Sequence, residues 1–422
     1  MHAYENRFAA EQGVQFFPFP RANFMVLSDI HCYNTRLGIR GLAYQRMLAE
    51  SKEIKMLDDS EELLDEALAE ARRQQVDFLL ICGDLTKDGE LDSHQLVASK
   101  LQRFVKCGIP VYVINGNHDI NNQRAATYTG HQEQRIPSIT PEVYQDLYAP
   151  FGLRSSIYRD HHSLSYLAEP VPGLWMLALD SCRWRKGFRV DGAFSRSTML
   201  WIESVLTKAQ AKGIPVFGMM HHGVLEHFVG NEKHFKDYLV NKHQQVARLL
   251  AVNGLRAMFT GHFHCQDIAI QWFGDVDFLY DIETGSLVTY PCPYRKVKVE
   301  GELMEITSNP ITRTASHDHG FSEYAFQRSY QLAELAVKQT LTKWRMSQED
   351  IKKVAPQIIR AFQAHCVGNE EPLTSEVITL KGLGAWGRLV LTIKKPLLED
   401  LWNNSPPADN HLSINLKTGE YK

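Results

Sequence analysis

The sequence predicts an α/β protein that carries a mainly helical segment at its C-terminal end. Between residues 21 and 310, short apolar runs of strand length alternate with longer segments of helical spacing. Helix formers dominate beyond Pro310, and polar clusters rich in Asp, Asn and His follow most of the apolar runs. These observations predict a layered α/β domain over residues 21–310, an N-terminal extension over residues 1–20 and a mainly helical domain over residues 311–422.

The α/β region is expected to begin with three strands, each ended by a polar turn. Gly108 and Pro110 mark the end of a helix before the third strand, because both residue types interrupt regular structure. The predicted strands of this part are Phe24–Ser28, Asp77–Cys82 and Val111–Ile114, and its helices begin near Asp59 and at Leu91.

The alternation continues and is expected to close with a hairpin around Glu300-Gly301-Glu302. The predicted strands are Leu174–Leu179, Pro215–Met220, Ala257–Thr260, Arg295–Val299 and Leu303–Thr307, and the predicted helices are Ser197–Lys212 and His243–Asn253.

Two helices are predicted in the C-terminal segment, Phe321–Met346 and Gln348–Ala364, with Ser347 as a capping residue between them. The Gly-rich residues 381–388 and the Pro-containing residues 403–410 are expected to be irregular. The apolar face of the first helix is expected to pack against the α/β domain, although a lid or an oligomer interface would use the same face. This face consists of Leu332, Leu335 and Ala336.

Composition and charge exclude several classes of protein. The chain has 422 residues with 46 basic and 49 acidic side chains, a net charge of −3, so a nucleic acid polymer is not an expected partner. No run approaches the roughly 20 apolar residues of a membrane span, and the N-terminus lacks a signal-peptide pattern. Seven cysteines without a CxxC pair predict free thiols in a reducing, cytoplasmic compartment.

The polar clusters contain side chains that bind metal ions. In open α/β sheets ligands bind beyond the carboxyl ends of strands, so residues far apart in the sequence are expected to converge there. The paired ligands of Asp29-x-His31 and His262-x-His264 lie two positions apart, and such residues point to the same side of an extended chain. The candidate ligands are Asp29, His31, Asp84, Asn117, His221 or His222, His262 and His264.

Seven ligands are too many for one metal ion that must also leave room for a substrate. Two divalent ions that share a carboxylate are the expected arrangement, because ions about 3.5–4 Å apart can hold a bridging hydroxide and clamp the oxygens of a displacement at phosphorus. Oxygen and imidazole ligands without thiolate suit Mn, Fe or Zn. Gly83, Gly116 and Gly261 permit tight turns directly before three ligands. The sequence therefore predicts hydrolysis of a phosphoester.

Five short motifs, in this order, resemble the calcineurin-like metallophosphoesterase superfamily over about residues 21–310. They are Asp29-Ile30-His31, Gly83-Asp84, Gly116-Asn117-His118-Asp119, His221 and Gly261-His262-Phe263-His264. The chain is most similar to the cyclic-nucleotide phosphodiesterase (class III) branch at Gly83-Asp84-Leu85-Thr86, Leu179-Asp180-Ser181 and Leu200-Trp201-Ile202-Glu203. The resemblance implies a four-layer α/β/β/α sandwich with a dimetal site at its edge.

The resemblance also implies a role for each matching residue. His118 would be catalytic and would donate a proton or hydrogen bond to the leaving or non-bridging oxygen. The family usually has His-His-Pro-Pro where this chain has His221-His222-Gly223-Val224, and only this comparison favours His221 over His222. The implied ligands are Asp29, His31, Asp84 and His264 for one ion, and Asp84, Asn117, His221 and His262 for the other.

We predict that the substrate is a small-molecule phosphodiester, such as a cyclic nucleotide or a glycerophosphodiester. A phosphomonoesterase or protein phosphatase is the alternative among enzymes, and a binding scaffold that uses the helical domain is the alternative outside them. The loops at residues 32–58 and 121–163 are expected to select the substrate, because the metal site alone cannot.

Other polar residues are interpreted as structural. Isolated surface histidines are commoner than ligands, which applies to His161-His162, His227 and His317-Asp318-His319. Cys265, close to a ligand motif, is expected to be a small buried packing residue. Arg183-Trp184-Arg185-Lys186 is expected to be a solvated loop with one packed aromatic side chain rather than a phosphate contact.

Overall fold

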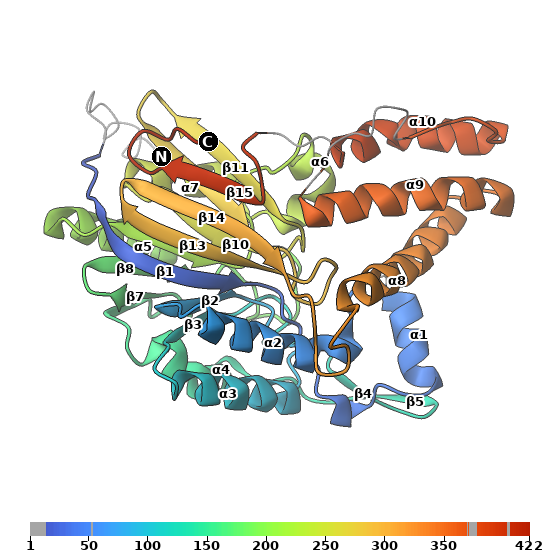
Figure 1. The fold of residues 1–422 in the computed structure, drawn as a ribbon, viewed down its shortest axis with the longest axis horizontal. Coiled ribbons are helices and arrows are strands. Elements are labelled where there is room, and N and C mark those ends of the chain that lie inside the picture. The colour runs from blue at the N-terminus through green and yellow to red at the C-terminus, as the bar shows by residue number, and fades with distance from the viewer. Residues whose placement is uncertain (1–13, 52–53, 369, 371–377, 403–405) are drawn as a thin grey trace.

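Two β-sheets face each other in the centre of the molecule (Figure 1). The computed structural model describes residues 14–51, 54–368, 370, 378–402 and 406–422. The first sheet has the order β15-β14-β13-β1-β2-β3, formed by His411–Asn415, Leu303–Pro310, Pro293–Gly301, Phe19–Leu27, Phe78–Cys82 and Val111–Ile114. The second has the order β11-β12-β10-β9-β8-β7-β6, formed by Asp267–Phe273, Asp277–Glu283, Ala257–Thr260, Val216–Met220, Leu174–Leu179, Tyr166–Val171 and Tyr158–Arg159.

Each sheet contains a block of parallel strands, and these blocks carry the longest apolar runs. β1, β2 and β3 are parallel in the first sheet, as are β8, β9, β10 and β12 in the second. β2, β3, β8, β9 and β10 are buried along their whole length, as expected for parallel strands covered on both faces. The carboxyl ends of the strands in a block lie at one edge, which is where the polar turns follow.

Aromatic stacking joins the inner faces of the two sheets. The ring of Phe24 in β1 stacks on Phe78 at 4.6 Å between centroids and on Phe217 of the other sheet at 5.4 Å, and Phe259 meets it edge-on at 5.5 Å. Such pairs contribute about 0.5–1.5 kcal/mol each beyond their buried area. This cluster joins the two sheets across the core between them.

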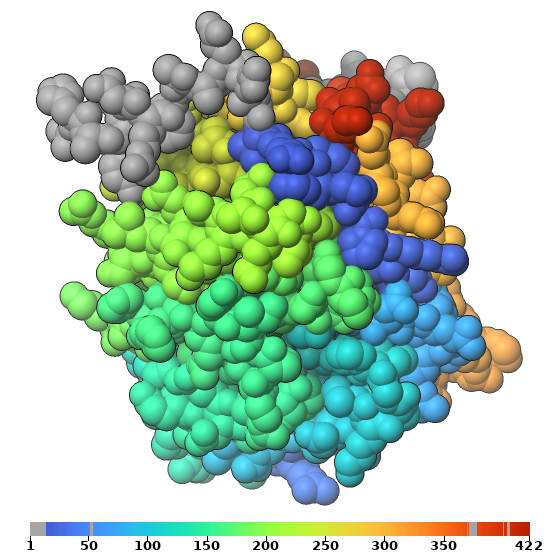
Figure 2. Space-filling model, turned by 90° about the vertical axis from the view of Figure 1, so that its left-hand side faces the viewer, coloured from blue at the N-terminus to red at the C-terminus, as the bar shows by residue number. Residues whose placement is uncertain are grey.

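Helices cover the outer face of each sheet and complete a four-layer α/β/β/α sandwich. α2 (Ser60–Arg73) and α3 (Leu91–Val105) bury one face against the first sheet, and α5 (Arg196–Lys212) and α7 (His243–Val252) bury one against the second. This architecture is the fold class that the sequence and its resemblance predict. Figure 2 shows how the chain interleaves, since its blue start lies between green segments from the middle and orange and red segments from the end.

Additional elements decorate this sandwich. A two-stranded hairpin, β4 (Ala126–Thr129) with β5 (Gln132–Arg135), lies beside α1 (Leu42–Ser51). Two short helices, α4 (Pro141–Tyr148) and α6 (Asn231–Phe235), lie in the connections between strands. The sequence predicts none of these elements, nor the antiparallel strands β6, β7 and β11.

Three helices, α8 (Phe321–Lys343), α9 (Gln348–Val367) and α10 (Ala385–Asp400), follow the hairpin of β13 and β14. The hydroxyl of Ser347 accepts from the backbone N–H of Asp350 and caps α9, which confirms the predicted cap. Leu332 packs into the core beneath the first sheet, whereas Leu335 is 43% exposed, so only part of the predicted apolar face is used.

The expectation of irregular structure over residues 381–388 is wrong from Ala385 onward, where α10 begins. Gly387 lies inside this helix, where it faces α9. A Cβ atom at this position would lie 2.6 Å from the Asp350 carboxylate, so the glycine allows the two helices to approach each other. The Gly-rich pattern therefore predicts irregular structure at a place where glycine instead permits close helix packing. The chain then returns to the first sheet as β15, which pairs antiparallel with β14. No helix in the described ranges is both long and apolar enough to cross a membrane.

Candidate metal centre

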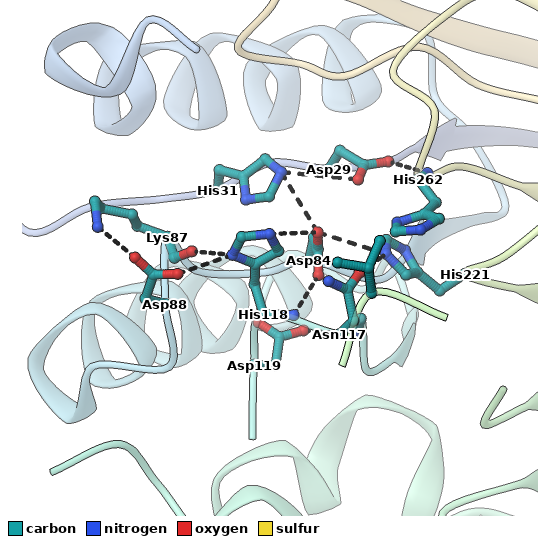
Figure 3. A network of polar contacts seen from close by, with 12 residues as sticks. Asp29, His31, Asp84, Lys87, Asp88, Asn117, His118, Asp119, His221 and His262 are labelled. Atoms are coloured by element: carbon teal, nitrogen blue, oxygen red, sulfur yellow. Dashed lines mark hydrogen bonds and ion pairs between the residues drawn. The ribbon is translucent and has the colours of Figure 1, made fainter. Parts of the chain in front are cut away.

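The predicted ligands lie in the turns that follow β1, β2, β3, β9 and β10, at the edge shared by both sheets (Figure 3). Five of them adopt positive backbone φ, a conformation rarely found outside glycine and enriched at functional sites. They are Asp29 (49°), His31 (35°), Asp84 (48°), His262 (77°) and His264 (70°). The chain turns sharply at each strand end and directs these side chains into one space.

Two groups of donor atoms meet at the carboxylate of Asp84. Within each group the donor atoms lie within 4.8 Å of one another. The first group is Asp29, His31, Asp84 and His264, and the second is Asp84, His221 and His262. The side-chain oxygen of Asn117 extends the second group, at 2.9 Å from Nε2 of His221. All seven predicted ligands therefore converge on one place.

Hydrogen bonds to backbone carbonyls leave imidazole lone pairs directed at this space. Nδ1 of His31 donates to the carbonyl oxygen of Thr86 at 3.3 Å, and Nδ1 of His221 donates to that of Cys82 at 2.9 Å. Their Nε2 atoms lie 3.5 and 3.4 Å from Oδ2 of Asp84. A histidine oriented from its far nitrogen in this way is typical of a metal ligand.

Among the predicted ligands, two buried carboxylate oxygens lack hydrogen bonds, and both belong to the donor groups around this space. Oδ2 of Asp84 has no hydrogen bond, although three imidazole nitrogens lie within 4.0 Å of it. Oδ1 of Asp29 also has none, with Nε2 of His264 at 3.2 Å. Oxygen and nitrogen donors gathered around two unpaired carboxylate oxygens form an arrangement that a cation would stabilise. The residues therefore fit a binuclear metal centre in which Asp84 is shared.

His222 differs from His221 because both of its ring nitrogens have partners in the protein. Nδ1 lies 2.8 Å from the hydroxyl of Ser181, and Nε2 lies 2.9 Å from the carbonyl oxygen of Val190. His222 is not part of either donor group. The geometry thus favours His221 as the ligand.

Gly116 makes room for the shared carboxylate. A Cβ atom at this position would lie 2.0 Å from Oδ1 of Asp84 and 2.1 Å from the backbone nitrogen of the same residue. No side chain fits there, so the glycine is required by the approach of two strand ends rather than by its own φ.

Electrostatics within the site are dominated by burial and by charge pairs. Burial raises the pKa of Asp84, but the imidazoles of His221, His118 and His31 outweigh it and hold the pKa well below its ordinary range. Burial lowers the pKa of His31 well below its ordinary value. Burial also opposes the charge on His221, but Asp84 raises its pKa to about 9. Asp84 thus stays ionised and acts as the negative centre of the site.

His118 lies beside the ligand groups, with its Nε2 4.0 Å from Oδ2 of Asp84 (Figure 3). Its Nδ1 faces away from them, at 2.6 Å from the carbonyl oxygen of Lys87 and 3.0 Å from Oδ1 of Asp88. Its backbone N–H donates to Oδ1 of Asp84 at 2.9 Å. One end of the ring is held by the protein, and the other faces the donor groups.

A cavity of about 350 Å³ lies over the donor groups. Its floor includes Asp84, Asn117 and His118, and two basic residues, Lys55 and Arg124, also line it. The remaining walls are largely aromatic or aliphatic, and two of their residues come from the helical segment. These apolar residues are Ile54, Phe188, Val190, Phe235, Phe263, Phe362 and Leu401.

The sequence interpretation missed several of these residues. Lys55 and Arg124 come from the two loops expected to select the substrate, but nothing singled out either basic residue. Phe362 lies on α9, far along the chain from any motif. Asp88 lies close to the Gly83-Asp84 motif in the sequence, and this closeness is the one sequence signal for its position beside His118.

Two expectations about non-ligand residues can be compared with the structure. Trp184 is packed and donates to the Asp180 carboxylate at 2.9 Å, while Arg183 pairs with Asp191 away from the donor groups, as expected for that loop. The expectation of a surface position for His227 is wrong, because this residue is buried between Asp267 and Asp281.

Comparison with protein families identifies the chain. The calcineurin-like phosphoesterase model matches residues 22–266, more than half of the sequence, and this range includes every candidate ligand. The chain belongs to this family. Calcineurin-like phosphoesterases use a binuclear metal centre, in keeping with the two donor groups that share Asp84. No curated protein is significantly similar to the chain in sequence.

Solved structures resemble this phosphoesterase at low sequence identity. A dimetal phosphatase from Danio rerio is 16% identical over 69% of this chain and 97% of its own, with a TM-score of 0.49. Purple acid phosphatase PPD1 from yellow lupin (Lupinus luteus) seeds is 10% identical over 72% of this chain, with a TM-score of 0.41. The match covers 54% of the lupin chain, about half its length.

Proposed function

We propose that this phosphoesterase hydrolyses a phosphodiester bond of a small molecule, of the cyclic-nucleotide or glycerophosphodiester type. The observation that carries the proposal is the cavity of about 350 Å³ over the donor groups, with Phe362 and Leu401 of the helical segment among its walls. This volume suits a small ligand. Apolar walls beside the metal centre offer a surface for the second ester substituent, which a monoester lacks.

The proposed ligands of one ion are Asp29, His31, Asp84 and His264, and those of the other are Asp84, Asn117, His221 and His262. The imidazole and oxygen donors suit Mn, Fe or Zn. When bound, the pair of ions supplies an activated water and polarises the phosphoryl oxygens. Asp84 contributes negative charge at the centre of the pair, and Asn117 contributes a neutral oxygen.

His118 is proposed to act as the general acid or hydrogen-bond donor. Burial lowers its pKa, but Asp84 and Asp88 outweigh this effect and raise it above the ordinary histidine value. The raised pKa favours the protonated ring, whose Nε2, the nitrogen that faces the donor groups, would then carry a proton to donate. Lys55 and Arg124 add positive charge to the cavity, which favours a phosphate anion.

A reducing, cytoplasmic compartment is proposed from the cysteines. All seven are free thiols, and six of them are buried. Proteins of oxidising compartments commonly pair such residues.

The test compares bis(p-nitrophenyl) phosphate with p-nitrophenyl phosphate. The proposal expects a higher kcat/KM for the diester, loss of activity on chelation and recovery with Mn²⁺. Asn117→Ala and His118→Ala should each retain the fold and lose at least about 10²-fold in kcat. A faster monoester reaction would favour a phosphomonoesterase instead. A wild-type chain that binds no metal would favour the alternative function, a binding scaffold. The complete set of metal donors argues against that alternative.

A further inference from the structure

A second group of buried polar side chains lies where the end of α9 meets the start of β11 (Figure 1). Asp267 begins β11, His365 lies in the last turn of α9, and Glu370 follows that helix. One donor atom of each residue lies within 4.8 Å of the other two. We propose that these three side chains form a third metal site, which binds one Zn²⁺ or Mn²⁺ ion and joins the helical segment to the α/β domain.

His365 and Glu370 each keep a buried atom without a partner. Nδ1 of His365 lies 2.7 Å from Oε1 of Glu370, so these two atoms share a hydrogen bond. Nε2 of His365 and Oε2 of Glu370 have no hydrogen bond, although the side chains are only 2% and 3% exposed. An unpaired buried polar atom is unfavourable, because it has lost its hydrogen bonds to water without replacing them. Nδ1 of His365 and Oε1 of Glu370 both face the space between the two side chains, where a bound cation would replace the shared proton.

Among the described residues of this region, acidic side chains outnumber basic ones. Two cations lie in this region. One is His227, which lies 3.0 Å from Asp267 and 3.3 Å from Asp281, and the other is Arg295. Arg295 donates to backbone carbonyl oxygens and to Ser308 rather than to a carboxylate. Five buried carboxyl groups lie beside these two cations, and a bound divalent ion would offset the charge of those that are ionised. The buried carboxylates are Asp267, Asp281, Glu283, Glu370 and Asp409.

Asp409 is a further buried carboxyl group beside this cluster. Its Oδ1 accepts from the backbone N–H of Ile268 at 3.0 Å, but its Oδ2 has no hydrogen bond. A cation bound by Asp267, His365 and Glu370 would bring positive charge close to the unpaired oxygen of Glu370.

The proposed ion would connect α9 to the strand that follows the His262-x-His264 motif. The two segments are already in contact, because the backbone N–H of Gln266 donates to the carbonyl oxygen of Cys366 at 3.3 Å. The thiols of Cys265 and Cys366 also lie 3.4 Å apart there. Carboxylate and imidazole donors beside thiols suit Zn²⁺ or Mn²⁺ better than Mg²⁺ or Ca²⁺.

Metal content of the purified full-length chain tests the proposal. Protein loaded with Zn²⁺ or Mn²⁺ alone, then desalted, is analysed by inductively coupled plasma mass spectrometry. His365→Gln and Glu370→Gln should each bind about one ion per chain less than the wild type. The matched controls His319→Gln and Glu349→Gln, at side chains 97% and 81% exposed, should bind the wild-type amount. This difference does not depend on how many ions the Asp84 centre holds.

Crystals of the loaded wild type keep the test decisive if His365→Gln fails to fold. An anomalous difference map at the Zn or Mn edge should then show a peak between Asp267, His365 and Glu370. Unchanged metal content in folded Glu370→Gln, or no peak at this position with either ion, would overturn the third site.

Discussion

Nδ1 of His118 lies 3.0 Å from Oδ1 of Asp88, on the side of the ring away from Asp84. The carboxylate of Asp88 is itself held, because Nδ2 of Asn122 donates to it at 3.0 Å and Lys87 forms an ion pair with it. All of these groups are buried. The pair therefore fixes both the orientation and the charge of the proposed general acid, and Asp88 is a positioning residue.

Asp88→Asn should lower kcat by about 10–100-fold, because the amide orients His118 less firmly and no longer stabilises its positive charge. Removing a group that raises the pKa of His118 lowers that pKa. The acid form is then lost at lower pH, so the basic limb of the kcat/KM profile should move down in pH. Asp92→Asn, at an exposed position in the first turn of α3, is the control. A kcat loss without a shift of the basic limb would contradict the assignment.

Gly116→Ala should abolish metal binding at the Asp84 centre. The new methyl group would lie 2.0 Å from Oδ1 of Asp84, so the carboxylate or the turn must move. We expect a loss of stability of about 1–3 kcal/mol by urea unfolding, and a lower metal content. Gly384→Ala is the control, since its nearest neighbour, an oxygen of Asp350, would lie 3.3 Å away. Full metal content in Gly116→Ala would mean that the turn is less constrained than described.

Most strands buried on both faces could be located from the sequence to within one residue. Leu174–Leu179 and Ala257–Thr260 match β8 and β10 because each is a continuous apolar run with a polar turn behind it. β11 and β15 could not be found in this way. Their residues are only partly buried, and β15 depends on β14, which is distant in sequence. Edge strands take their structure from a partner rather than from their own pattern.

The ligands were identifiable because each lies in a short motif whose spacing reflects local geometry. The residues around the substrate cavity carry no such pattern. Lys55 and Phe362 line the same cavity from opposite parts of the chain, and only tertiary packing brings them together. His227 could not be predicted to be buried, because a lone histidine in the sequence gives no indication that three buried carboxylates surround it. Chemistry was therefore predictable from sequence, whereas substrate selection was not.

His94 should make the protein less stable in acid. The ring is fully buried, between the hydroxyl of Tyr148 at 2.8 Å and the carbonyl oxygen of Asp119 at 2.9 Å. Burial lowers the pKa of His94 to about 3, against an ordinary value of 6.5. Between these values the unfolded chain binds a proton that the folded chain does not, so stability is full above pH 6.5 and falls as the pH drops toward 3.

From pH 7 to pH 5, the free energy of unfolding of the wild type should therefore fall by about 2 kcal/mol more than that of His94→Gln. Urea unfolding at both pH values measures this difference. His161→Gln, at an exposed position, should keep the wild-type dependence on pH. Parallel curves for the wild type and His94→Gln would show that His94 takes up its proton in the folded protein as well.

Arg124 offers the last test, which concerns the charge of the substrate. Its guanidinium lies 4.1 Å from the ring centroid of Phe188, beside the cavity, and the residue is exposed. Exposed ion pairs contribute about 0.2–1 kcal/mol, so Arg124→Gln should lower kcat/KM for a diester by no more than about fivefold. A monoester dianion carries more charge and should lose more. High salt should reduce both losses, because it screens exposed charges. Arg135→Gln, at an arginine with a side chain 60% exposed and paired with Glu133, is the control. Losses that are equal for both esters and independent of salt would mean that Arg124 supports the wall around Phe188 and does not attract the anion.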